Sequence, residues 1–466
     1  MQGSLAAVKN PVPKGLIRVP PAENVSDKRK RVLSGMRPTG RLHIGHYFGA
    51  LQNWISLQND PQYECFYFIA DWHALTTDYA DTSFVAQNTI EIGIDWLAAG
   101  LDPDKSTLFV QQWVPEHAEL NLLLSMIAPL GWLERVPTYK EALDNIKDKD
   151  LHTLGFLGYP VLQTADIVMY GEPDTELVVP VGEDQKSHVE LGREIVRKFN
   201  FHFGLTVDKE AMTRPENAGA VDTLCGQLLS GYAKGGSIVY PFSMAQAEII
   251  EERIRERAEE AGLRNLIDYF AKFVRDETVV RKFVQIEEKL REPEAMLTHT
   301  PRIPGLDGRK MSKSYGNAIM LSESDEDIRK KTKVMVTDPA RKRRQDPGNP
   351  EVCPVFDWHK LFSPKEVQDW SAHGCRTAGI GCIECKAKMA DHLIQWIEPI
   401  RQRRRDFESD PQQVLEYLDT GSKRARMVAQ QTMDRVREAV FHWDEKREEI
   451  GGRQRQAKNI PAGRGD

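Results

Sequence analysis

The chain of 466 residues lacks the segments that membrane and secreted proteins need. It has no run of about 18 apolar residues, which excludes a transmembrane helix. Residues 1–30 contain proline and basic side chains but no apolar stretch, which argues against a secretory signal and predicts a flexible leader. Cysteine is scarce, at six residues. These absences predict a cytoplasmic protein that does not enter the membrane.

What is present is the composition of an ordinary globular protein, with 40% hydrophobic and 28% charged residues. The net charge of −6 would by itself argue against a nucleic-acid partner. The charge is unevenly distributed, however, because residues 1–327 hold 35 basic and 48 acidic side chains, whereas residues 328–466 hold 28 and 21. A basic final third on an acidic body predicts a polyanion as the partner of that final third.

Strand and helix patterns alternate along the first two thirds of the chain. The predicted strands are 31–34, 64–70, 107–112 and 176–181, and the predicted helices are 44–58, 88–99, 116–130 and 183–199. This alternation predicts an α/β fold with a doubly wound parallel sheet, which binds ligands at the carboxyl ends of its strands. From about residue 325 the strand signal fades. Helices are predicted there at 387–405, 411–418 and 422–442, before a disordered tail at 451–466.

The first predicted strand runs into a glycine-rich turn and a helix with the sequence SGMRPTGRLHIGH at 34–46. Glycine lets the backbone approach a ligand closely, and the free N–H groups of a helix N-terminus favour phosphate. His43 and His46 lie one turn apart, so both can donate to one anion. A tight turn with two surface histidines explains this segment equally well when it is taken alone.

A second segment, Lys310–Ser314, has the sequence KMSKS and follows a Pro-Gly-Leu-Asp-Gly stretch. Two lysines on such a loop suit the stabilisation of charge on a transferring phosphate group, although a solvated basic loop is the simpler interpretation. Together, the two segments resemble the HIGH and KMSKS signatures of class I aminoacyl-tRNA synthetases. In that family they embrace ATP while an amino acid is adenylated.

Four more segments are similar to the tryptophanyl-tRNA synthetases: ADWHA (70–74), YPVLQTADI (159–167), VGEDQ (181–185) and GSKRAR (421–426). The resemblance covers about 31–202 and 289–450, and it implies a Rossmann-like catalytic domain and a C-terminal α-helical domain. Residues 203–288 have no counterpart in the family pattern, and we expect them beside the active-site face. The predicted divisions are a leader (1–30), the catalytic domain (31–202 and 289–325), an inserted helical subdomain (203–288), an anticodon-binding helical domain (326–450) and a tail (451–466).

The resemblance also implies two adjoining sites, one for ATP and one for tryptophan. The implied catalytic residues, which stabilise the transition-state charge, are His43, His46, Lys310 and Lys313. The other implied ATP-binding residues, with Mg²⁺ accompanying the nucleotide, are Arg37, Pro38, Thr39, Gly45, Gly182, Glu183, Asp184, Ile303, Met311, Ser312 and Ser314. The implied tryptophan-binding residues are Tyr159 and Gln185 for the ammonium or carboxylate group, and His73, Gln163 and Asp166 around the indole.

Asp166 also attracts attention on physical grounds. It lies in an otherwise apolar stretch, where an unpaired charge is costly. Indole has one N–H donor and no acceptor, so a buried carboxylate would select tryptophan over phenylalanine. An aspartate satisfied by a helix cap or by an arginine is the alternative interpretation of the same residue.

Four of the six cysteines fall within 33 residues: Cys353, Cys375, Cys382 and Cys385. In a chain without a secretory signal, such a cluster indicates a metal site rather than a disulfide framework. Four thiolates suit either a tetrahedral zinc ion or a [4Fe–4S] cluster, and the spacing does not choose between them. The chain is also similar to a subset of the family whose C-terminal domain holds a [4Fe–4S] cluster, which implies that cluster here with Zn²⁺ as the alternative.

The expected partners are L-tryptophan, ATP and tRNA(Trp), and the expected assembly is a homodimer. The residues predicted to bind tRNA phosphates are Arg341, Lys342, Arg343 and Arg344. Three other functions remain open: a tyrosyl-tRNA synthetase, a small-molecule nucleotidyltransferase with an HxGH motif, and a non-catalytic RNA-binding paralogue. The Gly-Glu-Asp-Gln and Ala-Asp-Ile segments favour tryptophan over tyrosine. The lysine loop and the basic C-terminus argue against the nucleotidyltransferase, and the intact signature residues argue against the paralogue.

Overall fold

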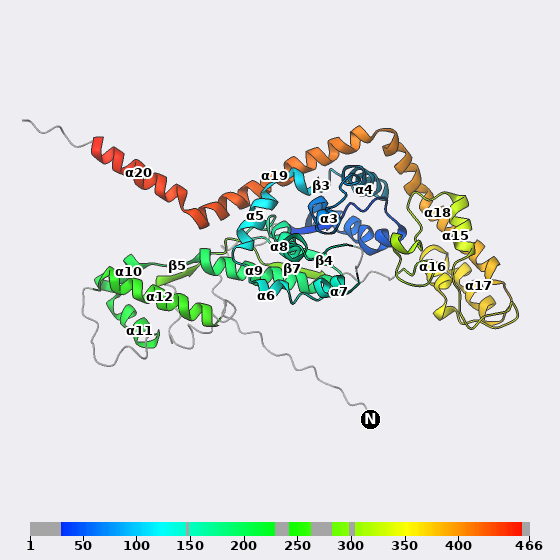
Figure 1. Cartoon of the computed structure of the whole chain (residues 1–466), viewed down its shortest axis with the longest axis horizontal. Coiled ribbons are helices and arrows are strands. Elements are labelled where there is room, and N and C mark those ends of the chain that lie inside the picture. The colour runs from blue at the N-terminus through cyan, green and yellow to red at the C-terminus, as the bar shows by residue number, and fades with distance from the viewer. Residues whose placement is uncertain (1–28, 146–148, 229–241, 262–281, 298–302, 459–466) are drawn as a thin grey trace, which may run out of the picture.

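A computed structural model describes residues 29–145, 149–228, 242–261, 282–297 and 303–458, and its centre is a parallel sheet (Figure 1). The sheet has the strand order β3-β2-β1-β4-β7. Its members are β1 (Lys30–Met36), β2 (Tyr63–Ile69), β3 (Ser106–Val110), β4 (Leu177–Val181) and β7 (Pro293–Leu297). The predicted α/β class and the four predicted strands are therefore confirmed. The predicted leader falls almost wholly on residues 1–28, outside the described part of the chain.

Alternate residues of each strand enter two separate hydrophobic cores, one on each face of the sheet. Val32 of β1 belongs to one core and Leu33 to the other. All five residues of β4 are buried, as expected for a strand covered by helices on both faces. The helices of this α/β region are α1 (Ile44–His46), the π-helix η1 (Tyr47–Leu51), α2 (Gln52–Gln58), α3 (Asp71–Asp78), α4 (Val85–Ala99), η2 (Gln111–Trp113), α5 (Glu116–Ser125), α6 (Leu130–Leu133), α7 (Pro137–Asn145), α8 (Leu154–Val168), η3 (Glu183–Gln185) and α9 (Lys186–Gly204).

The segment between α9 and β7 has its own hydrophobic core, as an inserted subdomain would. Its described elements are β5 (Leu205–Val207), α10 (Lys209–Thr213), η4 (Pro215–Asn217), α11 (Ala218–Leu228), α12 (Met244–Ala261) and β6 (Val284–Ile286), with β5 and β6 antiparallel. The expectation that it adjoins the active-site face is wrong. Helix α9 starts beyond the carboxyl end of β4 and carries the chain back by about 28 Å. Because β7 then runs parallel to β4, the insertion lies at the amino ends of the strands.

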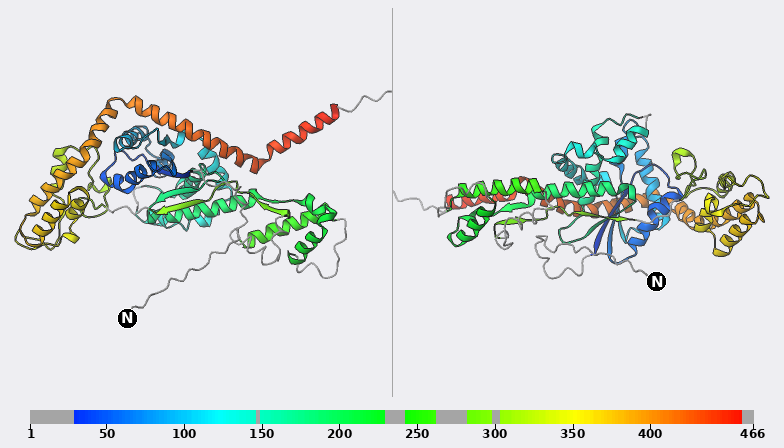
Figure 2. Two further views of the ribbon diagram at one scale, coloured as in Figure 1. Left: turned by 180° about the vertical axis from the view of Figure 1, so that it is seen from behind. Right: turned by 90° about the horizontal axis from the view of Figure 1, so that it is seen from below.

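The C-terminal region is helical, as predicted. Its helices up to residue 409 lie at the opposite end of the molecule from the insertion, whereas the last two helices run back along the body toward the insertion's side (Figure 2). It contains α15 (Asp325–Lys333), η7 (Pro350–Val352), α16 (Pro354–Phe362), α17 (Lys365–Arg376), α18 (Cys382–Ser409), α19 (Pro411–Phe441) and α20 (Trp443–Lys458). In the described part of the chain, no helix is both long enough and apolar enough to cross a membrane.

Helix α19 joins two helices that the sequence predicts separately, and the reason is its contact with the sheet. It packs along β3, the edge strand, where a Cβ on Gly421 would lie 1.8 Å from the carbonyl oxygen of Leu108. The adjacent Ser422 accepts a hydrogen bond from the Val110 N–H at 3.2 Å. The glycine thus permits close approach to a strand rather than breaking the helix. The helix covers a strand edge that would otherwise be open.

The predicted disordered tail at 451–466 is wrong in part. Helix α20 continues to Lys458, and only residues 459–466 lie outside the described chain. The sequence there is poor in apolar residues, which suggests disorder when composition alone is considered. A charged helix that projects from the body, as α20 does in Figure 1, satisfies its own backbone hydrogen bonds and needs few apolar contacts.

Candidate active site

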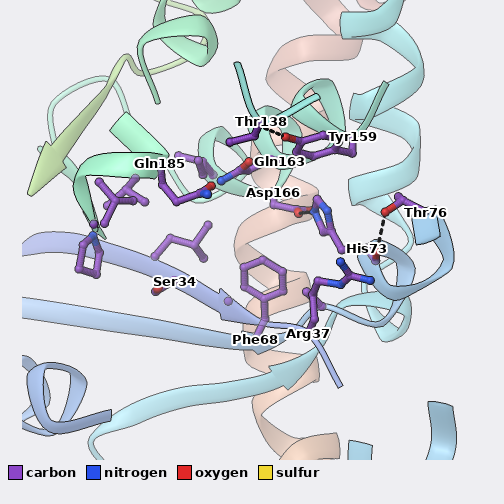
Figure 3. Close-up of a pocket in the computed structure, with 18 of the residues that line it drawn as sticks. Ser34, Arg37, Phe68, His73, Thr76, Thr138, Tyr159, Gln163, Asp166 and Gln185 are labelled. Carbon is purple, nitrogen blue, oxygen red and sulfur yellow. Dashed lines mark hydrogen bonds and ion pairs between the residues drawn. The ribbon is translucent and has the colours of Figure 1, made fainter. Parts of the chain in front are cut away.

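A cavity of about 510 Å³ opens at the carboxyl ends of β1 and β4. These neighbouring strands flank the point where the sheet's strand order reverses, which is the usual ligand position in such folds. Figure 3 shows side chains from β1, β2, α3, α8 and η3 converging on it. Seven of the residues predicted to bind ATP or tryptophan line this cavity: Arg37, His73, Tyr159, Gln163, Asp166, Gly182 and Gln185.

Asp166 is a fully buried side chain in the cavity wall. Its Oδ1 accepts hydrogen bonds from Gln111 at 2.8 Å and from His117 at 2.7 Å, and its Oδ2 lies 2.7 Å from Nε2 of His73. Burial alone would raise the pKa of Asp166, but the bonds from His117 and His73 outweigh it and lower the pKa to about 2. Three donors occupy three of about four acceptor positions on the carboxylate. The cavity side can therefore accept one more donor.

The cavity also receives hydroxyl and amide side chains, two of which come from the same helix, α8, as Asp166. The Tyr159 hydroxyl lies 2.6 Å from the Thr138 hydroxyl and 2.7 Å from Nε2 of His188. Burial raises the pKa of Tyr159, so the phenol stays neutral at pH 7. Gln163 and Gln185 point toward one another across the cavity in Figure 3. These side chains offer both donors and acceptors, which is what a zwitterion requires.

The signature turn lies directly after β1, next to this cavity. The His43 N–H donates to Nδ1 of His46 at 3.2 Å, and the two rings stack with centroids 3.6 Å apart. Because Nδ1 of His46 is an acceptor, its neutral ring carries the proton on Nε2. Burial and the charge of Lys313 lower the pKa of His43 to about 4, and burial with the charges of His43 and Lys313 lowers that of His46 to about 3. Both histidines are therefore neutral hydrogen-bonding groups at pH 7.

Backbone pairing brings the second signature segment to the first. The Ile44 N–H donates to the Ile319 carbonyl at 3.0 Å, and the Leu321 N–H donates to the Leu42 carbonyl at 2.8 Å. As a result, Nζ of Lys313 donates to the Thr39 carbonyl at 2.7 Å. Sδ of Met311 lies close to Gly45, since a Cβ there would stand 3.4 Å from it.

The lysine loop is organised by the buried side chain of Asn317. Its Nδ2 donates to Asp307 at 2.7 Å and to the Lys310 carbonyl at 3.1 Å, and its Oδ1 accepts from the Ser312 N–H at 2.8 Å. Ser314 is exposed, with its hydroxyl 2.8 Å from that of Ser312. Lys310 is exposed as well, so its contact with phosphate stays a prediction.

The remaining predicted ATP-binding residues are placed less decisively. Ile303 is buried next to the lysine loop, and Pro38 lies in the glycine-rich turn. Glu183 is exposed in η3, and the side chain of Asp184 lies outside the described part of the chain. Arg37 lines the cavity while its guanidinium group is bound by α3, where it donates to Asp78 at 3.2 Å.

Known proteins with similar sequences place the chain in a family. The pattern described as tRNA synthetases class I (W and Y) matches residues 26–240 and 271–398. A tryptophan–tRNA ligase of Ralstonia nicotianae is 44% identical over 414 residues, which cover 88% of this chain and 98% of that protein. A tryptophan–tRNA ligase of Thermotoga maritima is 41% identical over 411 residues, with 88% and 98% covered. The chain belongs to the class I tryptophanyl-tRNA synthetases. The family predicted from the signature segments is confirmed.

Solved structures agree with this synthetase fold. The crystal structure of tryptophanyl-tRNA synthetase from Campylobacter jejuni complexed with ADP and tryptophane superposes with a TM-score of 0.64 at 27% identity, covering 88% of this chain and 99% of that chain. A second Campylobacter jejuni structure gives a TM-score of 0.60 at 27% identity, with 89% and 99% covered.

The four predicted cysteine ligands of this synthetase come together between α16, α17 and α18. Cys353 precedes α16, Cys375 lies in the last turn of α17, and Cys382 and Cys385 lie in the first turn of α18. All four line one small cavity, with Arg341 and Ser371 in its wall. In the described chain, no group of three or more His, Cys, Asp or Glu side chains is arranged to hold a metal ion. The metal therefore stays a prediction.

The four cations predicted to bind tRNA separate into two kinds. Arg341 is buried, and its Nη2 donates to the carbonyl of Arg344 at 3.0 Å and to that of Ile380 at 2.5 Å. Including it among the phosphate-binding residues was wrong, because its guanidinium group holds the cysteine loop together. Lys342, Arg343 and Arg344 are exposed.

Other C-terminal arginines join the helices to the catalytic body. Arg426 donates to Glu116 at 2.9 Å, Arg437 to Glu119 at 2.6 Å, and Arg403 to the Ala98 carbonyl at 2.6 Å. Part of the positive charge of the final third therefore serves internal contacts rather than a polyanion.

Sequence reasoning missed the residues that support Asp166 and Tyr159. Gln111 and His117 follow β3 and are fully buried, yet neither belongs to a recognisable motif. The only local signal was a histidine next to a glutamate at the start of a helix, which is also a common surface pattern. Thr138 and His188 come from two further helices and meet Tyr159 only in the folded chain.

Proposed function

We propose that the chain activates L-tryptophan with ATP and transfers it to tRNA(Trp) for protein synthesis. The observation that carries this proposal is the arrangement at the reversal point of the sheet. A buried carboxylate, Asp166, faces the cavity, and the turn that follows Arg37 of the cavity wall holds neutral His43 and His46 near Lys313. One side suits an indole N–H, and the other suits a polyphosphate.

In the first step, a carboxylate oxygen of tryptophan attacks the α-phosphorus of ATP. The new P–O bond gives Trp-AMP as the bond to the β-phosphate oxygen breaks, and pyrophosphate leaves with Mg²⁺. No general base is required, since the attacking carboxylate is ionised at pH 7. His46 would donate its Nε2 proton as a hydrogen bond, and His43, Lys310 and Lys313 would stabilise the same developing charge. A ribose hydroxyl of the tRNA terminus then attacks the adenylate carbonyl and releases AMP.

Tryptophan would lie with its indole N–H against the remaining acceptor position of Asp166. Gln163 and His73 border that position, and Tyr159 and Gln185 would receive the ammonium and carboxylate groups. Phenylalanine would leave the buried carboxylate without its last donor. A site built on such a hydrogen bond rejects the analogue that lacks it by about 10⁴–10⁵-fold. Tyrosine would bring a hydroxyl group to the wrong position.

The deciding experiment is ATP–pyrophosphate exchange with tryptophan, tyrosine and phenylalanine as separate substrates. Exchange that depends on tryptophan alone supports the proposal. Exchange with tyrosine would move the substrate assignment to tyrosine. No exchange with any amino acid would contradict an adenylating enzyme and favour a non-catalytic RNA-binding role.

For tRNA, we propose that the exposed cations Lys342, Arg343 and Arg344 contact the phosphate backbone. Replacing all three with alanine should lower tRNA charging about tenfold at moderate salt and flatten its salt dependence, because fewer counterions are released. Pyrophosphate exchange should be unchanged. Lys365→Ala is a matched control, since Lys365 is also an exposed lysine of the C-terminal region, bound to Asp369 at 2.7 Å. Equal losses of charging and of exchange would contradict a tRNA contact.

For the metal, we propose a [4Fe–4S] cluster on Cys353, Cys375, Cys382 and Cys385, with Zn²⁺ as the alternative. Two observations support the fit: the four thiols share one cavity, and three of them lie at helix N-termini, whose dipoles favour thiolate charge. When bound, the group would supply a structural link rather than catalysis.

The metal proposal is tested on anaerobically purified protein by assaying iron, sulfide and zinc. About four irons and four sulfides per chain, lost in Cys382→Ser and retained in the control Cys225→Ser, are expected for the cluster. Cys225 is buried in the inserted segment, far from the four thiols in sequence. One zinc ion per chain would support the zinc alternative in place of the cluster. Absence of both iron and zinc would contradict both assignments.

We further propose a homodimer in the cytoplasm. An exposed apolar pair, Leu122 and Met126, supports the dimer, because the two residues are four apart at the end of α5 and are 54% and 71% exposed. The six free cysteines suit a reducing compartment. Light scattering should give twice the chain mass, and Leu122→Glu with Met126→Glu should reduce it to one chain. An unchanged mass in that variant would contradict the assigned surface.

A further inference from the structure

Asp95, in the middle of α4, connects the signature turn to a C-terminal helix. Its Oδ2 accepts the Leu42 N–H at 2.6 Å, and its Oδ1 is paired with Nη1 of Arg404 in α18. Both side chains are buried, with Asp95 0% and Arg404 2% exposed. Arg404 is thus a charged residue of the C-terminal region enclosed against the catalytic body, where α18 packs on α4.

The second arm of Arg404 extends the same connection. Its Nη2 is paired with Glu91 on α4 and lies 2.9 Å from Glu408 on α18. Arg41, which immediately precedes Leu42, donates to Glu91 at 3.0 Å. Two successive residues of the signature turn are therefore bound to a charge network that Arg404 closes.

The position of Leu42 matters because His43 follows it directly. The Leu42 carbonyl accepts from Leu321, and the Ile44 N–H donates to Ile319, so the backbone on either side of His43 is already paired. The Leu42 N–H is the remaining backbone donor at this point, and only a buried carboxylate meets it. It is the one of these three backbone contacts that ties the residue before His43 to α4, and the stacked His43 and His46 rings follow directly.

We propose that Asp95 and Arg404 are positioning residues, through which helix α18 holds the signature turn in the conformation that stabilises the adenylation transition state. Neither side chain lines the cavity, and neither would touch substrate. The inference rests on the proposed adenylation for its catalytic consequence. The structural half of it, that the pair fixes the turn, stands on the contacts alone.

The alternative role for this buried ion pair is purely structural, as a link between helices α4 and α18. Such a pair is often replaced by apolar residues without loss of stability, while removal of one partner is strongly destabilising. The acceptor for Leu42, by contrast, cannot be supplied by an apolar residue. Stability and catalysis should therefore respond differently to replacement of the whole pair.

The test uses the full-length chain with Arg404→Met, the double variant Asp95→Leu with Arg404→Met, and a matched control. The control is Arg31→Met, since Arg31 is a buried arginine that also pairs with two carboxylates, Glu64 at 3.0 Å and Glu172 at 2.8 Å. It lies at the start of β1, at the far end of that strand from the turn. Each protein is assayed for its unfolding midpoint, for pyrophosphate exchange, and for amide hydrogen exchange of a peptide spanning the turn.

We expect Arg404→Met to lower the unfolding midpoint and the kcat of exchange, the latter about tenfold, with the KM for tryptophan unchanged. The double variant should regain much of the midpoint, while kcat stays low and the turn amides exchange at least about tenfold faster than in the wild type. Arg31→Met should lose stability with normal kcat. Recovery of kcat together with the midpoint in the double variant, or equal kcat losses in Arg31→Met and Arg404→Met, would overturn the proposal.

Amide exchange separates this inference from the proposed function. If the wild-type chain shows no tryptophan-dependent pyrophosphate exchange, the proposed function fails. The turn amides still report on the pair in that case. Unchanged protection of the turn in the double variant would then reject the positioning role independently of any activity.

Discussion

The tryptophan cavity and the signature segments hold their polar groups in different ways. In the cavity, side chains from three helices converge on Asp166 and leave one of its acceptor positions for another donor. In the signature segments, paired backbone strands place two neutral histidines beside a partly buried lysine, while Lys310 remains exposed. The cavity is built to recognise one donor. The signature segments instead provide several donors, for which a polyphosphate would be the acceptor.

The largest effect is expected from a change in the tryptophan cavity. Asp166→Asn should raise the KM for tryptophan by at least about 100-fold, because the amide both weakens the indole contact and sets an N–H against His73, His117 or Gln111. Preference for tryptophan over phenylalanine should fall by a similar factor. Steady-state exchange with each amino acid measures both quantities. An unchanged preference would show that Asp166 serves structure alone.

The next largest effect is expected from a change in the signature segments. Lys313→Ala should lower the kcat of adenylation by about 100-fold, the typical cost of losing one transition-state donor, while tryptophan binding is little changed. Rapid-quench kinetics with direct tryptophan titration separate the two. Arg309→Ala, in the same loop but bound to Asp307, is the control and should remain near wild type. Equal losses in binding and in kcat would refute a transition-state role for Lys313.

A smaller effect is expected when the lysine loop is made less ordered while its phosphate-binding lysines are kept. Such a change tests whether the signature segments and the tryptophan cavity act separately. Asn317→Ala removes three hydrogen bonds that shape the lysine loop, and we expect about a tenfold loss of kcat with a raised KM for ATP. The KM for tryptophan should not change, because Asn317 belongs to the other half of the site. A rise in the tryptophan KM equal to that for ATP would mean that the halves are not separate.

The smallest effect concerns the protonation of the signature side. His43 and His46 have pKa values of about 4 and 3, below the ordinary value of 6.5. Between pH 6.5 and 4 the unfolded chain therefore binds protons that the native chain does not, and stability falls as the pH is lowered through this window. Urea unfolding should give a weaker loss between pH 7 and pH 5 in His43→Asn with His46→Asn. The exposed His152→Asn is the control, and an unchanged slope in the double variant would contradict buried neutral histidines.

The parts that sequence could predict are those with a local pattern. Parallel strands follow from apolar runs such as 64–70, and the two signature segments identify themselves by their order and glycine content. Asp166 is identifiable because a charged side chain in an apolar stretch is costly to bury unless it has a partner. Each of these inferences needs only neighbours along the chain.

The parts that sequence could not predict depend on partners distant in the chain. Arg404 and Asp95 are separated by 309 residues, and Asp166 and His117 by 49. Nothing in the run around Arg341 distinguishes a buried arginine from its exposed neighbours. The site of the insertion was also misjudged, because the length and direction of α9 decide which end of the sheet it reaches.

The close approach of Gly421 to Leu108 has a consequence for dissecting the molecule. Helix α19 covers the outer edge of β3, with Ser422 meeting the Val110 N–H. A fragment that ends before α19 would carry an unprotected β-strand, open to pairing with another copy. The catalytic body and its C-terminal helices therefore differ in function but cannot be separated by simple truncation. A minimal adenylating fragment would have to keep α19 or supply another cover for that strand.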